Sequence, residues 1–240
     1  IEFGVVTDEE GRPVAVEVFE GNTSDAKTVA TQIDKLRRRF KLDRVVVVGD
    51  RGMLTDARIR EDLAPHGLEW VTALRAPAIK QLRKTGVIQP SLFDQMDLAE
   101  LTSPDFPGER LVACRNPLLA KERARKRREL LAATEEDLSH VAGQTVDGGG
   151  KLRGKAEIGM RVGAIVGRHK MKKHFDIQVT DTGLTWSRRE EQIAEEAALD
   201  GLYVVRTNVD AERLDTDAVV TTYKQLANVE RAFRTMKTVD

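Results

Sequence analysis

The sequence of 240 residues lacks several features that would assign it to a specialised class of protein. Its one cysteine, Cys114, excludes an internal disulfide and a cysteine-rich zinc site, and it is compatible with a reducing cytosol. No apolar run approaches the roughly 20 residues that span a bilayer, and the first residues carry neither a basic leader nor a small-residue cleavage site. We therefore expect a soluble, cytoplasmic protein without a membrane partner.

Charge of one sign is also absent, because 39 Lys and Arg residues balance 39 Asp and Glu residues. Net charge therefore gives no argument for a nucleic-acid partner, and any such argument must rest on where basic residues cluster. The four histidines show no metal-ligand spacing, and the segment from Arg168 to His174 is interpreted as a basic surface segment. With 40% hydrophobic residues and no repeat, the chain can bury a core as one large domain or as a domain with an insertion.

Apolar runs predict the elements of the first 75 residues. Two β-branched runs flank a polar segment with Gly11 and Pro13, which is typical of an antiparallel hairpin. The continuous run at 45–48 is typical of a strand covered on both faces in the middle of a mixed or parallel sheet. The order β-β-α-β-α-β indicates an α/β layered sheet. The expected elements lie at residues 3–7, 14–19, 26–40, 45–48, 58–64 and 68–74.

The pattern becomes irregular between residues 77 and 183, so the middle of the chain is expected to form an insertion. Its charged helix carries six cations between Lys121 and Arg128, where a solvated helix or an ion-pair surface is favoured over a DNA contact. Three glycines at 148–150 predict a flexible turn. The further elements expected are helices at 79–84, 118–141, 188–199 and 214–237, the last with a candidate break at 225–228, a hairpin at 175–186 and a strand at 202–206.

Asp50 is the first candidate for chemistry, because it ends the most apolar predicted strand and precedes Arg51 and Gly52. In open α/β sheets, ligands bind at the carboxyl edge of the strands, where side chains leave the core. An aspartate in this place can also do no more than cap the following turn, which is a common role. The residues alone leave both interpretations open.

The second candidate is the set Tyr223, Glu230 and Lys237, spaced seven residues apart in a predicted helix. Seven residues are close to two helical turns, so the three side chains would project from one face. Arg234 follows Glu230 by four residues and shares that face. An exposed helix with a Glu230–Arg234 ion pair, worth a few tenths of a kcal/mol (about 0.3), is the simpler alternative.

Four segments resemble blocks of DDE transposases from bacterial insertion sequences, in the same order and over nearly the whole chain. They are GNTSD at 21–25, VGDRGM at 48–53, DGLYVVRT at 200–207 and YKQLANVERAFRTMK at 223–237. The last block is the most specific, since the family pattern is Tyr, two residues, Arg, three residues, Glu, six residues and Lys. Tyr223, Glu230 and Lys237 match this pattern, whereas Leu226 stands at the Arg position.

The resemblance implies a ribonuclease-H-like fold, in which a mixed sheet is interrupted by a long α+β insertion between the second and third catalytic carboxylates. Asp50 would be the second carboxylate and Glu230 the third, and the intact site would hold two Mg²⁺ ions, with Mn²⁺ as a substitute. Two hard cations on oxygen ligands activate the attacking oxygen and stabilise the leaving oxygen of an in-line displacement. The implied division is 1–76 and 188–240 for the two parts of the core and 77–187 for the insertion.

The first carboxylate of that fold lies on the first strand of a meander. The strands predicted at 3–7 and 14–19 would be the second and third, so the first catalytic Asp is expected upstream of Ile1. Asp8, in the hairpin turn, and Asp25, in a helix-cap region, do not replace it. We therefore expect this chain alone to be a fragment that binds metal weakly and catalyses no strand transfer.

The implied partner is double-stranded DNA, at the element ends and at the target, with a homodimer on DNA and association with the nucleoid. Tyr223 and Lys237 would orient DNA near the cut. Arg231, Arg234 and Lys237 would contact phosphates, which positions the substrate without reading its sequence. Trp186 is a candidate for stacking on an unpaired base, although a core tryptophan is the favoured interpretation.

Two alternatives remain beside transposition. A non-catalytic remnant or DNA-binding module of a decayed mobile element would keep the fold without activity, and the absent first Asp favours it. A nuclease of the same fold would stop after cleavage, and the helix with Tyr223, Glu230 and Lys237 argues against it.

Overall fold

The computed structural model describes residues 2–8, 10, 12–21, 45–94 and 96–237. The chain divides into two compact units. The first consists of Ile1–Arg115 together with Tyr203–Asp240, and the second of Asn116–Leu202. The second unit is therefore inserted into the first along the chain.

The middle segment expected from sequence, 77–187, begins earlier and ends earlier than the compact second unit. The difference at the start arises because two strands, β5 (Leu98–Leu101) and β6 (Arg110–Arg115), belong to the sheet of the first unit. Neither strand is anticipated in the sequence analysis, although the run from Leu111 to Cys114 is fully apolar and buried. The division into catalytic core and insertion stays a prediction.

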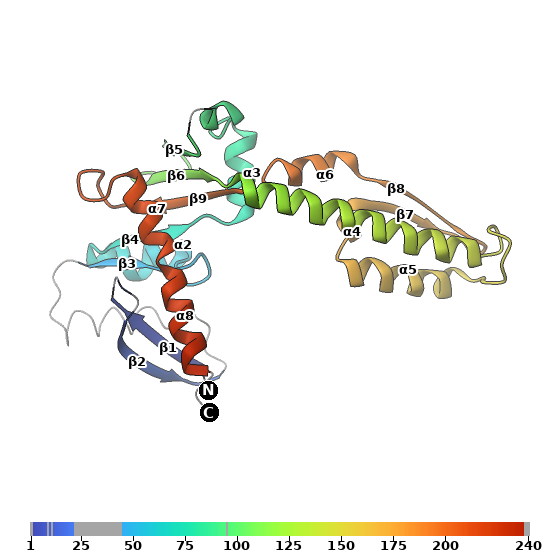
Figure 1. Cartoon of the computed structure of the whole chain (residues 1–240), viewed down its shortest axis with the longest axis horizontal. Helices are drawn as coiled ribbons and strands as arrows, with labels where there is room; N and C mark the ends of the chain where they lie inside the picture. The colour runs from blue at the N-terminus through green and yellow to red at the C-terminus, as the bar shows by residue number, and fades with distance from the viewer. Residues whose placement is uncertain (1, 9, 11, 22–44, 95, 238–240) are drawn as a thin grey trace. The chain divides into compact units, whose positions relative to one another are not determined.

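The first unit is built on a five-stranded sheet in the order β3-β4-β9-β6-β5 (Figure 1). β3 (Val46–Val48) and β4 (Glu69–Ala73) run parallel, whereas β4 and β9 (Leu202–Thr207) run antiparallel. The sheet is therefore mixed, and the α/β class expected from sequence is confirmed. Its core is made of β-branched residues, since Val71 and Val205 are fully buried.

The prediction that the valine run lies in the middle of the sheet is wrong for the described strands. β3 is at one end of the strand order, and Val46 to Val48 are half-buried. A continuous apolar run indicates that both faces of a strand can be covered. It does not predict whether the strand lies in the middle or at the edge of the sheet.

The N-terminal hairpin is confirmed: β1 (Glu2–Thr7) pairs antiparallel with β2 (Pro13–Phe19). Asp8 holds its turn, because Oδ1 accepts from the backbone N–H of Arg12 at 2.9 Å. β1 lies beside the C-terminal helix α8 (Figure 1). The helix predicted at 26–40, the block at 21–25 beyond its first residue and Asp25 lie outside the described residues.

The helix predicted at 58–64 is three short pieces: α2 (Asp56–Arg58), the π-helical η1 (Ile59–Leu63) and the 3₁₀ turn η2 (Ala64–His66). Pro65 has no backbone N–H to donate, so a regular helix cannot continue through η2. Gly67 then reverses the chain with a φ of 61° and leads into β4.

Arg206, on β9, ties the start of α2 to the sheet. Its side chain is buried and forms an ion pair with Asp56 and a bidentate pair with Glu109, at 2.6 and 2.5 Å. The guanidinium also lies 5.1 Å from the ring centroid of Trp70 and 4.9 Å from that of Phe106. Two carboxylates and two aromatic faces compensate the burial of this charge.

The second unit packs the helices α4 (Pro117–Gln144), α5 (Lys155–His169) and α6 (Glu190–Ala197) and a hairpin around its own apolar cores (Figure 1). Helix α4 extends further at both ends than predicted, and the predicted hairpin is confirmed as β7 (Phe175–Val179) and β8 (Leu184–Arg188). The remaining elements of the chain are α3 (Ala76–Lys84), η3 (Pro90–Phe93), η4 (Lys172–His174), α7 (Thr216–Lys224) and α8 (Leu226–Lys237).

Helix α5 is absent from the sequence-based prediction. Glycines at 159, 163 and 167 lower its helix propensity and hide the pattern. Its buried residues nevertheless follow helical spacing, with Ile158, Val162 and Ile165 facing the core. Tertiary packing of one apolar face therefore outweighs propensity here.

The structure bears on two predictions about charged residues of the second unit. His174 is buried, not on the surface, and its Nε2 lies 2.7 Å from Oε2 of Glu196. Within the cationic stretch of α4, Arg127 is buried in an ion pair with Asp200, whereas its neighbours Lys126 and Arg128 are exposed.

Candidate functional site

Asp50 lies just after β3, in a tight turn that leads into α2. Its Oδ1 accepts hydrogen bonds from the backbone N–H groups of Gly52 and Met53, both at 2.8 Å. A Cβ at Gly52 would lie 3.1 Å from that oxygen, so glycine gives the turn its room. The capping role considered above is therefore present. Asp50 is exposed, and within the described part of the chain no hydrogen bond engages its Oδ2.

A second strand end supports this turn. Arg75 follows β4, the parallel neighbour of β3, so both segments leave the sheet at the same edge. Its Nε and Nη2 donate to the carbonyl oxygen of Arg51, at 3.3 and 3.2 Å. The sequence analysis missed Arg75, although its place after a strand parallel to β3 is the same signal that singled out Asp50.

Tyr223 is half-buried near the end of α7 and packs against the core of the sheet. Burial is the largest cause that raises the pKa of its phenol. The negative charges of Asp50 and Glu230 raise this pKa further, whereas the positive charge of Arg51 lowers it. Because such effects fall off with distance, both carboxylates lie within electrostatic reach of Tyr223. The phenol is protonated at neutral pH and can donate a hydrogen bond.

The helix that carries the motif is interrupted at the expected place. α7 ends at Lys224 and α8 begins at Leu226. Tyr223 and Glu230 therefore belong to separate helices, and the seven-residue spacing does not run along one continuous helix. Glu230 is exposed, and its Oε2 lies 3.7 Å from Nη2 of Arg234.

The cations expected to contact phosphate are also on α8. Arg231 and Arg234 are exposed, and Lys237 is the last residue of the helix. The side chain of Lys237 lies outside the described part of the structure. The described cations thus flank Glu230 on the exposed surface of α8.

The site has two carboxylates within reach of one phenol, in a chain with a mixed sheet. A family model described as "Transposase DDE domain" matches residues 4–239. The chain belongs to this transposase family. Comparisons with curated proteins and with solved structures found no match. The mixed sheet is consistent with a ribonuclease-H-like DDE fold, and at family level the chain is related to enzymes of DNA transposition in mobile elements.

The family generally uses divalent metal ions, and the donor types of this transposase domain fit such a cation. Asp50 and Glu230 are exposed carboxylates, and Mg²⁺ is commonly bound by one or two carboxylates together with substrate phosphates. Among the described residues, however, no group of three or more His, Cys, Asp or Glu side chains could hold a metal ion. The described residues therefore do not form the three-carboxylate cluster that the family pattern implies.

Trp186 of the transposase domain is half-buried and packs against both apolar cores of the second unit. This agrees with the favoured interpretation of a core tryptophan, and base stacking stays a prediction. No described helix is long and apolar enough to cross a membrane.

Proposed function

We propose that this chain carries the second and third carboxylates of a metal-dependent active site for DNA cleavage and strand transfer. The observation that supports this most is that Asp50 is held in the turn after β3 by two backbone N–H groups on Oδ1, while Glu230 lies exposed on α8 beside Arg231 and Arg234. The match of nearly the whole chain to a transposase family gives that pair of carboxylates a chemical context.

Asp50 and Glu230 would hold the cations, with Oδ2 of Asp50 as the ligating oxygen because Oδ1 is occupied by two backbone N–H groups. When bound there, divalent cations supply Lewis-acid stabilisation of the attacking and leaving oxygens at phosphorus. Tyr223 donates a hydrogen bond that orients the DNA near the cut, a role that Lys237 would share. Arg231 and Arg234 neutralise phosphates next to Glu230. A homodimer on paired element ends belongs to this proposal.

A test measures Mn²⁺-dependent nicking of supercoiled plasmid by the chain extended upstream through the strand expected to carry the first catalytic Asp, together with Mn²⁺ binding by calorimetry. Glu230→Gln and Asp50→Asn remove one charge each with little change of shape, and Glu212→Gln is a matched control at an exposed glutamate of the same unit. We expect nicking to fall by about 100-fold or more in the two site variants, the order of a lost transition-state interaction, and to persist in the control.

Nicking that is unchanged in both site variants would contradict the assignment of these carboxylates. The rival function, a folded module without catalysis, is favoured by the absence of a three-ligand cluster among the described residues. It predicts that the extended chain neither binds Mn²⁺ nor nicks DNA.

A further inference from the structure

We propose that a hollow in the second unit binds the phosphodiester backbone of duplex DNA through Lys151, Arg153 and Arg161, at a site separate from Asp50 and Glu230. The hollow has a volume of about 550 Å³ and lies between the end of α4 and the start of α5. This proposal rests on the proposed function in one respect, namely that the substrate is DNA.

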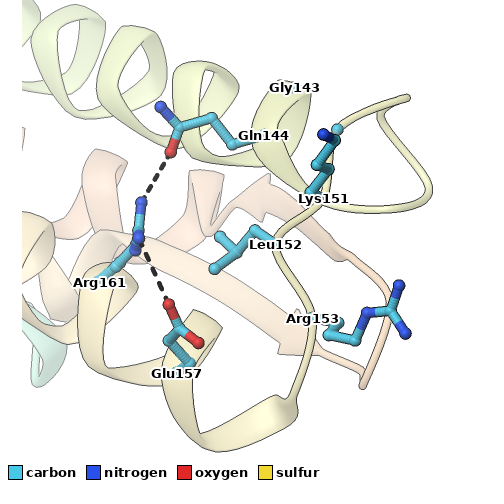
Figure 2. A pocket seen from close by; sticks show the side chains of 8 residues that line it. Gly143, Gln144, Lys151, Leu152, Arg153, Glu157 and Arg161 are labelled. Atoms are coloured by element: carbon cyan, nitrogen blue, oxygen red, sulfur yellow. Dashed lines mark hydrogen bonds and ion pairs between the residues drawn. The ribbon is translucent and has the colours of Figure 1, made fainter.

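The lining of the hollow favours an anion. Three cations and one carboxylate, Glu157, line it. The side chains of Lys151 and Arg153 are exposed and make no hydrogen bond or ion pair with any described residue. Figure 2 shows Arg161 across the hollow from the loop that carries these two side chains. Exposed cations gathered around a concave surface are the electrostatic footprint of a phosphate-binding site.

Arg161 is held in place at the wall of this hollow. Its Nη1 donates to Oε1 of Gln144 at 2.8 Å, and its Nη2 lies 3.4 Å from Oε1 of Glu157 (Figure 2). A guanidinium has five N–H donors, so these two contacts leave others for a phosphate oxygen. Glu157 compensates one positive charge, and the lining keeps a net charge of +2, from three cations and one carboxylate.

The loop that presents Lys151 and Arg153 packs closely against α4. A Cβ at Gly148 would overlap the carbonyl oxygen of Ala142, and one at Gly150 would overlap that of Gln144. The loop therefore lies directly on the C-terminal turn of α4.

Backbone hydrogen bonds fix this position. The N–H of Gly150 donates to the carbonyl of Thr145 at 2.8 Å, and that of Leu152 donates to Gln144 at 2.8 Å. Next to them, the N–H of Gly154 donates to Asp181 at 2.7 Å. These hydrogen bonds already hold the backbone of the loop in place, so binding costs little backbone entropy and this geometry favours affinity.

The experiment measures binding of the full chain to a short labelled duplex by fluorescence anisotropy, in EDTA and at several salt concentrations. The variant Lys151→Gln/Arg153→Gln removes two charges from the hollow. Lys170→Gln/Lys172→Gln is the matched control, because it removes two exposed charges at the other end of α5. Thermal melting of all three proteins checks that they fold equally.

We expect the slope of log affinity against log salt to become shallower by about 2 in the hollow variant, roughly 0.9 per lost phosphate contact, and to be unchanged in the control. The loss should be the same for duplexes of different sequence, since phosphate contacts read no sequence.

Equal slopes in the hollow variant and the unaltered chain would overturn this site while leaving the proposed function standing, because EDTA removes any role of the metal site. Equal loss in both variants would show a general effect of charge and would also overturn it. Failure of the unaltered chain to bind duplex DNA at low salt would contradict both the site and DNA as the substrate.

Discussion

At the scale of single residues, burial decides how much a charged side chain contributes to stability. Arg206 is 6% exposed and contacts Glu109, Asp56, Trp70 and Phe106. Arg125 is its opposite, with an exposed side chain that pairs with Glu129 one helical turn away at 2.7 Å. The same residue type therefore has two very different environments in this chain.

Arg206→Met is expected to lower the free energy of unfolding by about 3–5 kcal/mol, because it leaves the largely buried carboxylate of Glu109 without its partner. Arg125→Met is the matched control, and its exposed helical pair predicts a loss of at most about 0.5 kcal/mol. Urea denaturation followed by circular dichroism measures both values. Similar small losses in the two variants would show that Arg206 contributes no more than a surface arginine.

At the scale of elements, glycine has opposite meanings in two neighbouring segments of the second unit. The Cβ position of Gly163, inside α5, meets no atom within 4 Å. The Cβ position of Gly148, in the loop after α4, coincides with backbone. One glycine costs helix stability, and the other allows the loop to close on α4.

Gly163→Ala is expected to raise the free energy of unfolding by about 0.5–1 kcal/mol, because alanine restricts the unfolded chain and favours the helix. Gly148→Ala is expected to lower it, since the loop must move away from Ala142 to admit a methyl group. Urea denaturation of the two variants compares the effect of the same Gly-to-Ala substitution at the two positions. A destabilised Gly163→Ala protein would contradict this prediction, because it would show that a methyl group at position 163 meets other atoms.

At the scale of the whole molecule, acid is expected to loosen both units. Arg110 lowers the pKa of Glu100 in the first unit, and Arg188 lowers the pKa of Glu135 in the second, in each case mainly through hydrogen bonds to the carboxylate. The first pair joins the neighbouring strands β5 and β6, and the second joins α4 to β8, with contacts at 2.6 to 2.7 Å.

A carboxylate with a lowered folded pKa stabilises the fold above its unfolded pKa, and this contribution is lost as pH falls through the folded value. The unfolding free energy should therefore decrease below about pH 4.5, the ordinary value for glutamate. In Glu100→Gln the decrease should be shallower, whereas Glu212→Gln should follow the unaltered chain. Urea denaturation at several pH values measures this, and identical slopes in all three proteins would contradict the role of Glu100.

The sequence by itself determined the hairpin, the α/β class and the long helix α4, because period and turn chemistry are local properties of the chain. Asp50 and the block from Tyr223 to Lys237 needed no structure to be singled out. The break between α7 and α8 was also visible as a candidate in the sequence.

Only the tertiary structure decided which distant residues meet. That β5 and β6 join the first unit, that α5 forms despite its glycines and that Arg206 lies between two aromatic rings depend on packing across the chain. The approach of Asp50 and Glu230 to Tyr223 and the support of the Asp50 turn by Arg75 have the same origin. Each depends on side-chain burial and strand order. These are set by the free energy of the whole fold and cannot be predicted from a local sequence pattern.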